Sequence, residues 1–332
     1  MDKKILNAVA KKLVADGKGI LASDSSVGSM TRRLEKVGIE STKETRMAFR
    51  DIFITSEGLE DYITGVILFD ETIREYSDGG DLFTKILLDK GVMPGIKVDK
   101  KAWPMANFPG EMLAEGLDGL RDRLIEYKNM GATFAKWRAV ITIGEGIPTD
   151  TCINSNAESL ARYAALCQEV DIVPVVEPEV VMDGSHDMER CESVTYSTLK
   201  KVFTKLTEHR IYLGGMILKP NMILPGKDSK QKIEDDKVAE ATFRVLNEVV
   251  PDEVPGVVFL SGGQSADDAT RRLNLIAQRS VEAPWEVSFS FERALQEDAL
   301  NAWEGKKENV EKAKAEFIKR AKKVCSARKG EL

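Results

Sequence analysis

Short runs of apolar residues recur along the chain, and most of them end in charged or small polar residues. Apolar runs of about four to eight residues with such boundaries are typical of strands buried on both faces, as in a parallel sheet. Eight segments have this form: residues 19–24, 65–69, 94–99, 133–138, 172–179, 216–219, 256–263 and 285–290. We therefore predict eight buried strands.

Segments with helical periodicity lie among these strands. In one of them Leu160, Tyr163 and Cys167 fall on one stripe at helical spacing. The predicted helices cover residues 113–127, 156–168, 186–209, 235–250 and 266–277. Strands that alternate with helices favour parallel pairing through right-handed crossovers, and eight of them predict an α/β fold of the (β/α)8 TIM-barrel type.

The predicted barrel occupies the whole chain, residues 1–332, as a single domain. Residues 1–18 would form an extra N-terminal helix, and residues 297–326 would form C-terminal helices packed outside the barrel. Pro174 and Pro178 lie in the fifth strand, where each removes a backbone donor from the ladder. We expect the strand to begin at Pro174 and its geometry to be irregular at Pro178.

Charged residues gather where the predicted strands end. Active sites of TIM barrels form at the C-terminal ends of the strands, and strand residues two apart share a face. Four cations and four anions would then converge on one site: Asp24, Lys97, Asp99, Lys136, Arg138, Glu177, Glu179 and Lys219. So many charges along five strands indicate a functional site rather than ordinary strand ends.

Lys219 ends an apolar run that two glycines precede and a proline follows. An ammonium group buried without a partner is costly, so such a group tends to become neutral. A neutral amine is a nucleophile, and with a carbonyl substrate it forms a Schiff base. The alternative is a lysine that reaches solvent at a strand end, and the neighbouring charges favour the catalytic interpretation.

Two loops carry the features of anion sites. The first, LSGGQS at residues 260–265, follows the seventh strand, where TIM barrels often bind phosphate through backbone N–H groups. Its candidate ligands are Ser261, Gly262 and Gly263. Arg293, which follows the eighth strand, would add a charge-assisted contact. The second loop, residues 24–29, offers the hydroxyls of Ser26 and Ser29 beside Lys97 and Arg138. Two phosphate sites around a Schiff-base lysine suggest a linear sugar with a phosphate at each end.

Composition narrows the class of protein further. Hydrophobic residues make up 42% of the chain and the net charge is −6, which agrees with a large core and argues against a nucleic-acid or membrane surface. No apolar run approaches about 18 residues, and we predict no signal peptide. The four cysteines form no CxxC pair and are expected to be reduced thiols of a cytoplasmic protein.

Metal chemistry is bounded by the available ligands. His186 and His209 are the only histidines, so a three-histidine zinc site cannot be built. A carboxylate-only Mg²⁺ site stays possible because acids are plentiful. A lysine mechanism needs no metal, and we expect neither a metal nor another cofactor.

The chain resembles class I (Schiff-base) fructose-1,6-bisphosphate aldolases from about Lys18 to about Ala327. The resemblance lies in KGILA (18–22), GVILF (65–69), GIKVDK (95–100), FAKWR (134–138), VPVVEPE (173–179), LKPNM (218–222), FLSGGQS (259–265) and WEGKKEN (303–309). It implies a metal-free (β/α)8 enzyme of glycolysis and gluconeogenesis, usually a homotetramer. Its substrates would be fructose 1,6-bisphosphate and, in reverse, dihydroxyacetone phosphate and glyceraldehyde 3-phosphate.

The resemblance also implies roles. Lys219 would attack the C2 carbonyl, and Glu177 would transfer protons during carbinolamine formation and dehydration. Asp24 would take the C4 hydroxyl proton, Lys136 would stabilise charge near the reacting oxygens, and Glu179 would tune the network. Ser261, Gly262 and Arg293 would bind the C1 phosphate. The C6 phosphate would be bound by Lys97, Arg138, Ser26 and Ser29 with Arg33 nearby, while Asp99 and Asn221 would orient these groups.

The chain departs from the family pattern at three places. Ser25 replaces a usual glutamate beside Asp24, and Glu292 replaces a usual glycine before Arg293. The added carboxylate is expected to weaken C1-phosphate binding unless it points away. Many members also carry a tyrosine-ended tail, whereas this sequence closes at residues 329–332 without one, which predicts slow enamine protonation or another proton donor.

Two alternatives stay open at this point. One is sedoheptulose 1,7-bisphosphate as a main or shared substrate, since it presents the same reacting carbons. The other is a non-enzymatic scaffold that kept a sugar-phosphate pocket. The second would require a lost catalytic residue, and all of Asp24, Lys136, Glu177 and Lys219 are present.

Overall fold

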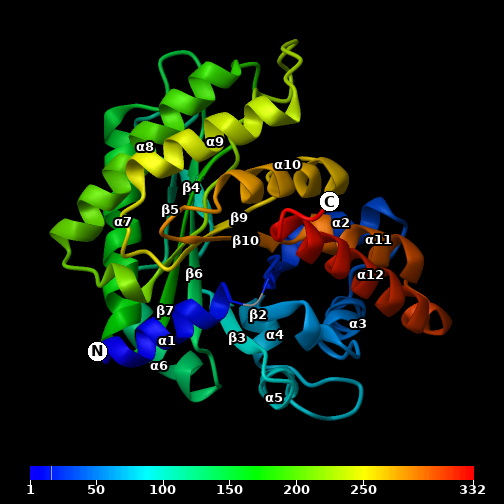
Figure 1. The fold of residues 1–332 in the computed structure, drawn as a ribbon. Helices are drawn as coiled ribbons and strands as arrows, with labels where there is room; N and C mark the ends of the chain where they lie inside the picture. The colour runs from blue at the N-terminus through cyan, green and yellow to red at the C-terminus, as the bar shows by residue number, and fades with distance from the viewer. Residues whose placement is uncertain (16) are drawn as a thin grey trace.

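A computed structural model describes residues 1–15 and 17–332 of the chain. Eight parallel strands close into a barrel with the order β1-β10-β9-β8-β7-β6-β3-β2, and helices surround it (Figure 1). The barrel strands are β1 (Gly19–Ser23), β2 (Ile63–Leu68), β3 (Met93–Lys97), β6 (Phe134–Ile141), β7 (Val173–Val180), β8 (Ile217–Leu218), β9 (Gly256–Phe259) and β10 (Glu286–Phe291). Each predicted strand contains or overlaps one of them, so the predicted (β/α)8 barrel is confirmed.

The helices fill the connections between the strands and follow the last one. The α-helices are α1 (Lys3–Leu13), α2 (Val27–Lys36), α3 (Lys43–Ile54), α4 (Asp70–Ile73), α5 (Phe83–Asp89), α6 (Leu120–Asn129), α7 (Asp150–Glu169), α8 (Met188–Glu208), α9 (Asp235–Val249), α10 (Ala266–Arg279), α11 (Arg293–Trp303) and α12 (Val310–Arg328). Three short 3₁₀ helices are η1 (Leu59–Asp61), η2 (Leu213–Gly215) and η3 (Lys307–Asn309).

The predicted helix at residues 113–127 is wrong in its first half. A small antiparallel hairpin of β4 (Ala102–Pro104) and β5 (Met112–Ala114) occupies this region, and α6 begins only at Leu120. Gly116 and Gly119 have φ values of 123° and 69°, which no right-handed helix accommodates. The glycines therefore separate the hairpin from the helix.

The N-terminal helix closes one end of the barrel. Leu6, Ala10 and Leu13 of α1 are buried in one cluster with residues from the barrel interior, among them Phe134 and Ile217. The predicted segment 1–18 is helical over α1 only, and Asp16 lies outside the described residues. Because the helix covers the N-terminal end of the strands, the opposite end remains open for a site.

The barrel interior is filled by large side chains that pack on glycines. A Cβ atom added to Gly95 would lie 2.3–2.6 Å from ring atoms of Phe134, closer than any real contact. We expect Gly95→Ala to destabilise the fold by about 1–3 kcal/mol, because the added methyl overpacks the interior. Urea unfolding would measure it, with Gly79→Ala as the control, since its nearest neighbour there would be the Ser77 hydroxyl at 3.5 Å. Equal stability of the two variants would contradict this packing.

The two prolines of β7 do not disturb it, contrary to prediction. The strand begins at Val173 and pairs with β6 without interruption through Pro178 to Val180. The Lys219 N–H donates to the Val176 carbonyl over 2.8 Å, so the backbone polar groups of Val176 point toward β8. Residues two apart along a strand point the same way, so the backbone nitrogens of Pro174 and Pro178 also face β8. Since β8 has only two residues, few ladder bonds exist on that side for a proline to remove.

All four cysteines are free and buried. Burial raises the pKa of the thiols of Cys152 and Cys325 to about 11 and about 12. Within the described residues, no helix is long and apolar enough to cross a membrane.

Candidate active site

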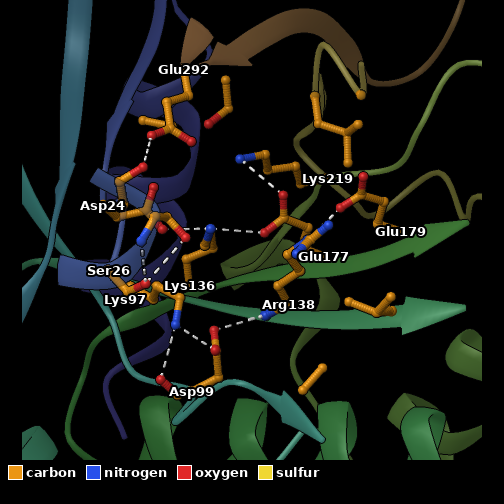
Figure 2. A pocket seen from close by; sticks show the side chains of 18 of the residues that line it. Asp24, Ser26, Lys97, Asp99, Lys136, Arg138, Glu177, Glu179, Lys219 and Glu292 are labelled. Atoms are coloured by element: carbon orange, nitrogen blue, oxygen red, sulfur yellow. Dashed lines mark hydrogen bonds and ion pairs between the residues drawn. The ribbon is translucent and has the colours of Figure 1, made fainter. Parts of the chain in front are cut away.

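The open end of the barrel holds a cavity of about 280 Å³, the active-site cavity (Figure 2). It lies at the C-terminal ends of the strands, where the sequence predicts a site. Thirteen of the predicted residues line it: Asp24, Ser26, Ser29, Lys97, Asp99, Lys136, Arg138, Glu177, Glu179, Lys219, Ser261, Gly262 and Arg293. Residues as far apart in the sequence as Asp24 and Arg293 therefore meet in one place.

Strand alternation determines which side chains enter the cavity. On β6, Lys136 and Arg138 line the cavity, whereas Trp137 between them is fully buried on the other face. There the Trp137 and Tyr163 rings pack with centroids 5.6 Å apart, which fixes the strand against α7. The register of β6 with β7 sets Arg138 opposite Glu177, so cations and anions of adjacent strands face the same space.

A chain of four buried charges crosses the middle of the cavity (Figure 2). Lys219 Nζ lies 3.1 Å from Glu177 Oε1, and Lys136 Nζ lies 3.0 Å from Glu177 Oε2. Lys136 Nζ also lies 2.6 Å from Asp24 Oδ2. The sequence argument treated Lys219 as buried without a partner, and this expectation is wrong. The pairing of Val176 with Leu218 brings the next residue of each strand, Glu177 and Lys219, together.

The charges of this chain stabilise one another. Burial by itself lowers the pKa of Lys136, but Asp24 and Glu177 outweigh it and raise that pKa above its ordinary value. Burial by itself raises the pKa of Glu177, but Lys136, Lys219 and Arg138 outweigh it and lower that pKa to about 2. Lys136 is therefore a cation and Glu177 a carboxylate at neutral pH, with Lys219 within hydrogen-bond reach of a group that can exchange protons.

A second group of charges forms one wall of the cavity. Lys97 and Asp99 form a close ion pair, and Asp99 also accepts the backbone N–H of Arg138 over 3.2 Å. The Arg138 guanidinium pairs with Glu179; burial by itself lowers its pKa, but Glu179 outweighs this and raises it. Asp99 thus contacts both Lys97 and Arg138, two of the predicted phosphate ligands.

The hydroxyl loop and Asn221, the second predicted orienting residue, are held by hydrogen bonds of their own. Ser26 Oγ donates to Ser29 Oγ over 3.2 Å where α2 begins. Asn221 accepts the backbone N–H of Val180 over 3.0 Å and donates to Thr195 Oγ1 over 3.2 Å. It therefore anchors the end of β7 just beyond Glu179, behind the cavity.

The loop after β9 contains two consecutive glycines in the left-handed region. Gly262 and Gly263 have φ values of 45° and 80°, which glycine adopts without strain. Ser261, Gly262 and Arg293 line the cavity, and Arg293 forms no ion pair with any described residue. Gly263 does not line it, since its Cα faces the Lys227 side chain instead.

Arg33 is the other predicted ligand outside the active-site cavity. It lines an adjoining cavity of about 470 Å³ between α2 and α11, together with Arg32 and Lys36. Its Nη1 lies 3.0 Å from Glu292 Oε1 and donates to Gln296 Oε1 over 2.8 Å. Arg33 is thus close to the site, as predicted, but paired.

Sequence reasoning missed several residues that shape the site. Arg50 is fully buried, pairs with Glu71 at 2.6 Å, and donates to the Ser25 carbonyl over 3.1 Å. Burial lowers the pKa of Arg50, although Glu71 opposes this. Lys101 lines the cavity from the loop after β3. Lys101 could have been found from the sequence, because a pair of lysines at residues 100–101 follows a predicted strand end. Nothing local in the sequence distinguishes Arg50.

The acids of the cavity are engaged by cations rather than grouped for a metal. Among the described residues, no set of three or more histidine, cysteine, aspartate or glutamate side chains is arranged to hold a metal ion. Lys136 pairs with the carboxylates of both Asp24 and Glu177. This arrangement suits proton transfer and anion binding.

Comparison with known proteins identifies the family. Residues 5–332 match the family model described as glycolytic, "Fructose-bisphosphate aldolase class-I". The "Probable fructose-bisphosphate aldolase class 1" of Xanthomonas campestris is 52% identical over 298 residues, which is 90% of this chain and 89% of that protein. Human "Fructose-bisphosphate aldolase C" is 48% identical over 320 residues, covering 96% of this chain and 88% of that one. A solved structure of fructose-bisphosphate aldolase from Plasmodium falciparum, in complex with TRAP and a small-molecule inhibitor, aligns with a TM-score of 0.97 and 42% identity, over 99% of this chain and 95% of that one. The chain therefore belongs to the class I fructose-bisphosphate aldolase family.

Proposed function

We propose that Lys219 is the Schiff-base lysine of this aldolase and that fructose 1,6-bisphosphate is its substrate. The observation that carries the proposal is the buried chain Lys219–Glu177–Lys136–Asp24, in which consecutive charged atoms are 2.6–3.1 Å apart. One end of the chain carries the amine, and the other carries a carboxylate suited to act as a base. Such an arrangement serves covalent catalysis on a ketone followed by proton removal from a neighbouring hydroxyl.

The first half of the reaction uses Lys219 and Glu177. The amine adds to the C2 carbonyl, and Glu177 transfers protons so that the carbinolamine loses water and becomes an iminium ion. The carboxylate of Glu177 touches both lysines, so a proton leaving Lys219 has an acceptor at 3.1 Å. The iminium ion then accepts the electron pair of the C3–C4 bond.

The second half uses Asp24 and Lys136. Asp24 takes the C4 hydroxyl proton, the C3–C4 bond breaks, and glyceraldehyde 3-phosphate leaves. Lys136, whose Nζ lies 2.6 Å from Asp24 Oδ2, stabilises the charge that develops on the reacting oxygens. Protonation of the enamine at C3 and hydrolysis then release dihydroxyacetone phosphate and restore Lys219, while Glu179 holds Arg138 in place beside the network.

The two phosphates have separate sites in this proposal. Ser261, Gly262 and Arg293 bind the phosphate on C1, and Arg293 is free to do so because it has no carboxylate partner in the described chain. The phosphate on C6 binds among the hydroxyls of Ser26 and Ser29 and the cations Lys97 and Arg138. Those two cations are paired with Asp99 and Glu179, so the phosphate must share them with the carboxylates.

Family membership supports the remaining parts of the proposal. The protein is expected to act as a single domain, as a cytoplasmic homotetramer and without a cofactor, with triose phosphates and sugar bisphosphates as its small-molecule partners. The names of the similar proteins support the six-carbon substrate. They give no support to sedoheptulose 1,7-bisphosphate or to a non-enzymatic scaffold.

Borohydride trapping tests this proposal directly. The protein is treated with borohydride in the presence of dihydroxyacetone phosphate, digested, and mapped by mass spectrometry, with and without EDTA. We expect one substrate adduct, on Lys219, and full cleavage activity in EDTA, because the iminium ion replaces a metal as the electron sink. An adduct on another lysine, or activity lost to the chelator, would overturn the mechanism.

A further inference from the structure

Glu292 differs from the other carboxylates of the active-site cavity. The other four lining acids, Asp24, Asp99, Glu177 and Glu179, pair with cations that also line the cavity. Glu292 instead pairs with Arg33, which lines only the adjoining cavity. It therefore joins a negative charge of the active-site cavity to a positive charge outside it.

The surroundings hold this carboxylate in place. Glu292 Oε1 accepts a hydrogen bond from Ser25 Oγ and lies 3.0 Å from Arg33 Nη1. Arg33 also donates to Gln296, which is fully buried, and its guanidinium lies over the Phe49 ring at 5.6 Å. Glu292 is the only carboxylate among the described residues that pairs with Arg33.

The position of this pair matters because of its neighbours. Glu292 immediately precedes Arg293, and both residues line both cavities. Arg293 is the only arginine of the active-site cavity without a carboxylate partner among the described residues, because Arg138 pairs with Glu179. A charge change at Glu292 is therefore felt where Arg293 would meet a phosphate.

We propose that Glu292 sets the phosphate affinity of this site. Its carboxylate neutralises the charge of Arg33 at the boundary of the two cavities, so Arg293 is the only arginine there whose charge is available to the phosphate among the described residues. This inference rests on the proposed placement of a phosphate at Ser261, Gly262 and Arg293. It makes Glu292 a specificity-determining residue that weakens the binding of doubly charged ligands while leaving the reacting groups untouched.

A charge cycle over Glu292 and Arg33 tests the proposal, with inorganic phosphate as the calorimetric probe and the KM for fructose 1,6-bisphosphate as the kinetic one. At low ionic strength we expect Glu292→Gln to lower both the phosphate Kd and the KM roughly tenfold, because a positive charge is left unpaired near a dianion. Arg33→Gln should raise both by a similar factor. The double variant should return to within about threefold of the parent, since the pair is neutral in each.

The turnover number distinguishes this role from a merely structural one. A change in uniform phosphate binding alters KM and leaves kcat nearly unchanged, whereas a loosened loop beside Asp24 lowers kcat. Glu297→Gln is the matched control, because it removes the same charge from α11 in the adjoining cavity but no contact with Arg33. The effects should also shrink in about 0.5 M KCl through screening.

The proposal is overturned when Glu292→Gln binds phosphate no more tightly than Glu297→Gln, or when the gain persists undiminished in salt. If the Glu292 variant does not fold, Arg33→Gln still tests the proposal, because it is expected to raise the phosphate Kd and the KM instead of lowering them. Borohydride trapping on Lys219 reports the proposed function separately. Normal trapping with unchanged phosphate affinity would therefore overturn this inference alone, and failed trapping would count against the mechanism.

Discussion

Lys219→Met is expected to lower the rate of fructose 1,6-bisphosphate cleavage by at least about 10⁴-fold, the largest effect of any substitution in the chain. Methionine fills a similar volume but cannot form a carbon–nitrogen bond with the ketone, so the electron sink is lost. The loss should lie in kcat, because the proposed phosphate ligands remain in place. Coupled-enzyme assays of cleavage and borohydride trapping measure the two consequences independently.

The stability of this variant distinguishes chemistry from folding. Lys219 is only 2% exposed, and replacing a buried charge by an apolar side chain of similar size is often neutral or stabilising, provided that its partner keeps another cation. Glu177 keeps Lys136 at 3.0 Å, so the unfolding midpoint should stay near that of the parent. Lys237→Met, which removes an exposed lysine paired with Glu240 on α9, is the control and should be fully active. Substantial turnover by Lys219→Met would end the Schiff-base account.

Lys136→Met is expected to lower kcat/KM by about 10²–10³-fold, because it removes the cation that pairs with both Asp24 and Glu177, the proposed base and proton-transfer group. The substitution also shifts the pH profile. Lys136 is the first of the cations that hold the pKa of Glu177 near 2 against burial. Without Lys136, the cations oppose the effect of burial less strongly and the pKa of Glu177 rises. The carboxylate therefore takes up its proton at a higher pH. The acid limb of the kcat/KM profile should therefore move to higher pH.

Two further measurements control this prediction. Asp24 and Glu177 would both be left buried near one another, which costs about 3–5 kcal/mol, so unfolding must be measured beside activity. Lys136→Arg keeps the charge and should keep the acid limb near its original position, even where its larger head group lowers the rate. An acid limb that does not move in Lys136→Met would show that Lys136 does not control the ionisation of Glu177.

Several features of this protein follow from local sequence. The strands could be predicted because apolar runs ending in charges mark parallel strands covered on both faces. Alternation along a strand then placed Lys136 and Arg138 on one face and Trp137 on the other, as the structure shows. The loop after β9 could also be predicted from local sequence, because its glycines adopt φ values that other residues avoid.

Other features needed the whole fold. The regular geometry of Pro178 depends on how short the neighbouring strand β8 is, which the sequence of β7 does not contain. The hairpin that replaced the first half of a predicted helix depends on two glycines whose φ values are set by their surroundings. Arg50, from α3, donates to the Ser25 carbonyl, and this contact is visible only in the folded chain.

The sequence by itself determined the barrel, the end of the barrel that carries the site, and most of the side chains that line it, because strand periodicity and loop chemistry act over a few residues. Only the tertiary structure decided which charges pair. Glu177 meets Lys219 and Glu292 meets Arg33 through strand register and helix packing, and the second pair joins residues 259 positions apart. Electrostatic energy depends on distance in space, so the ionisation of the site could not be read from the order of its residues.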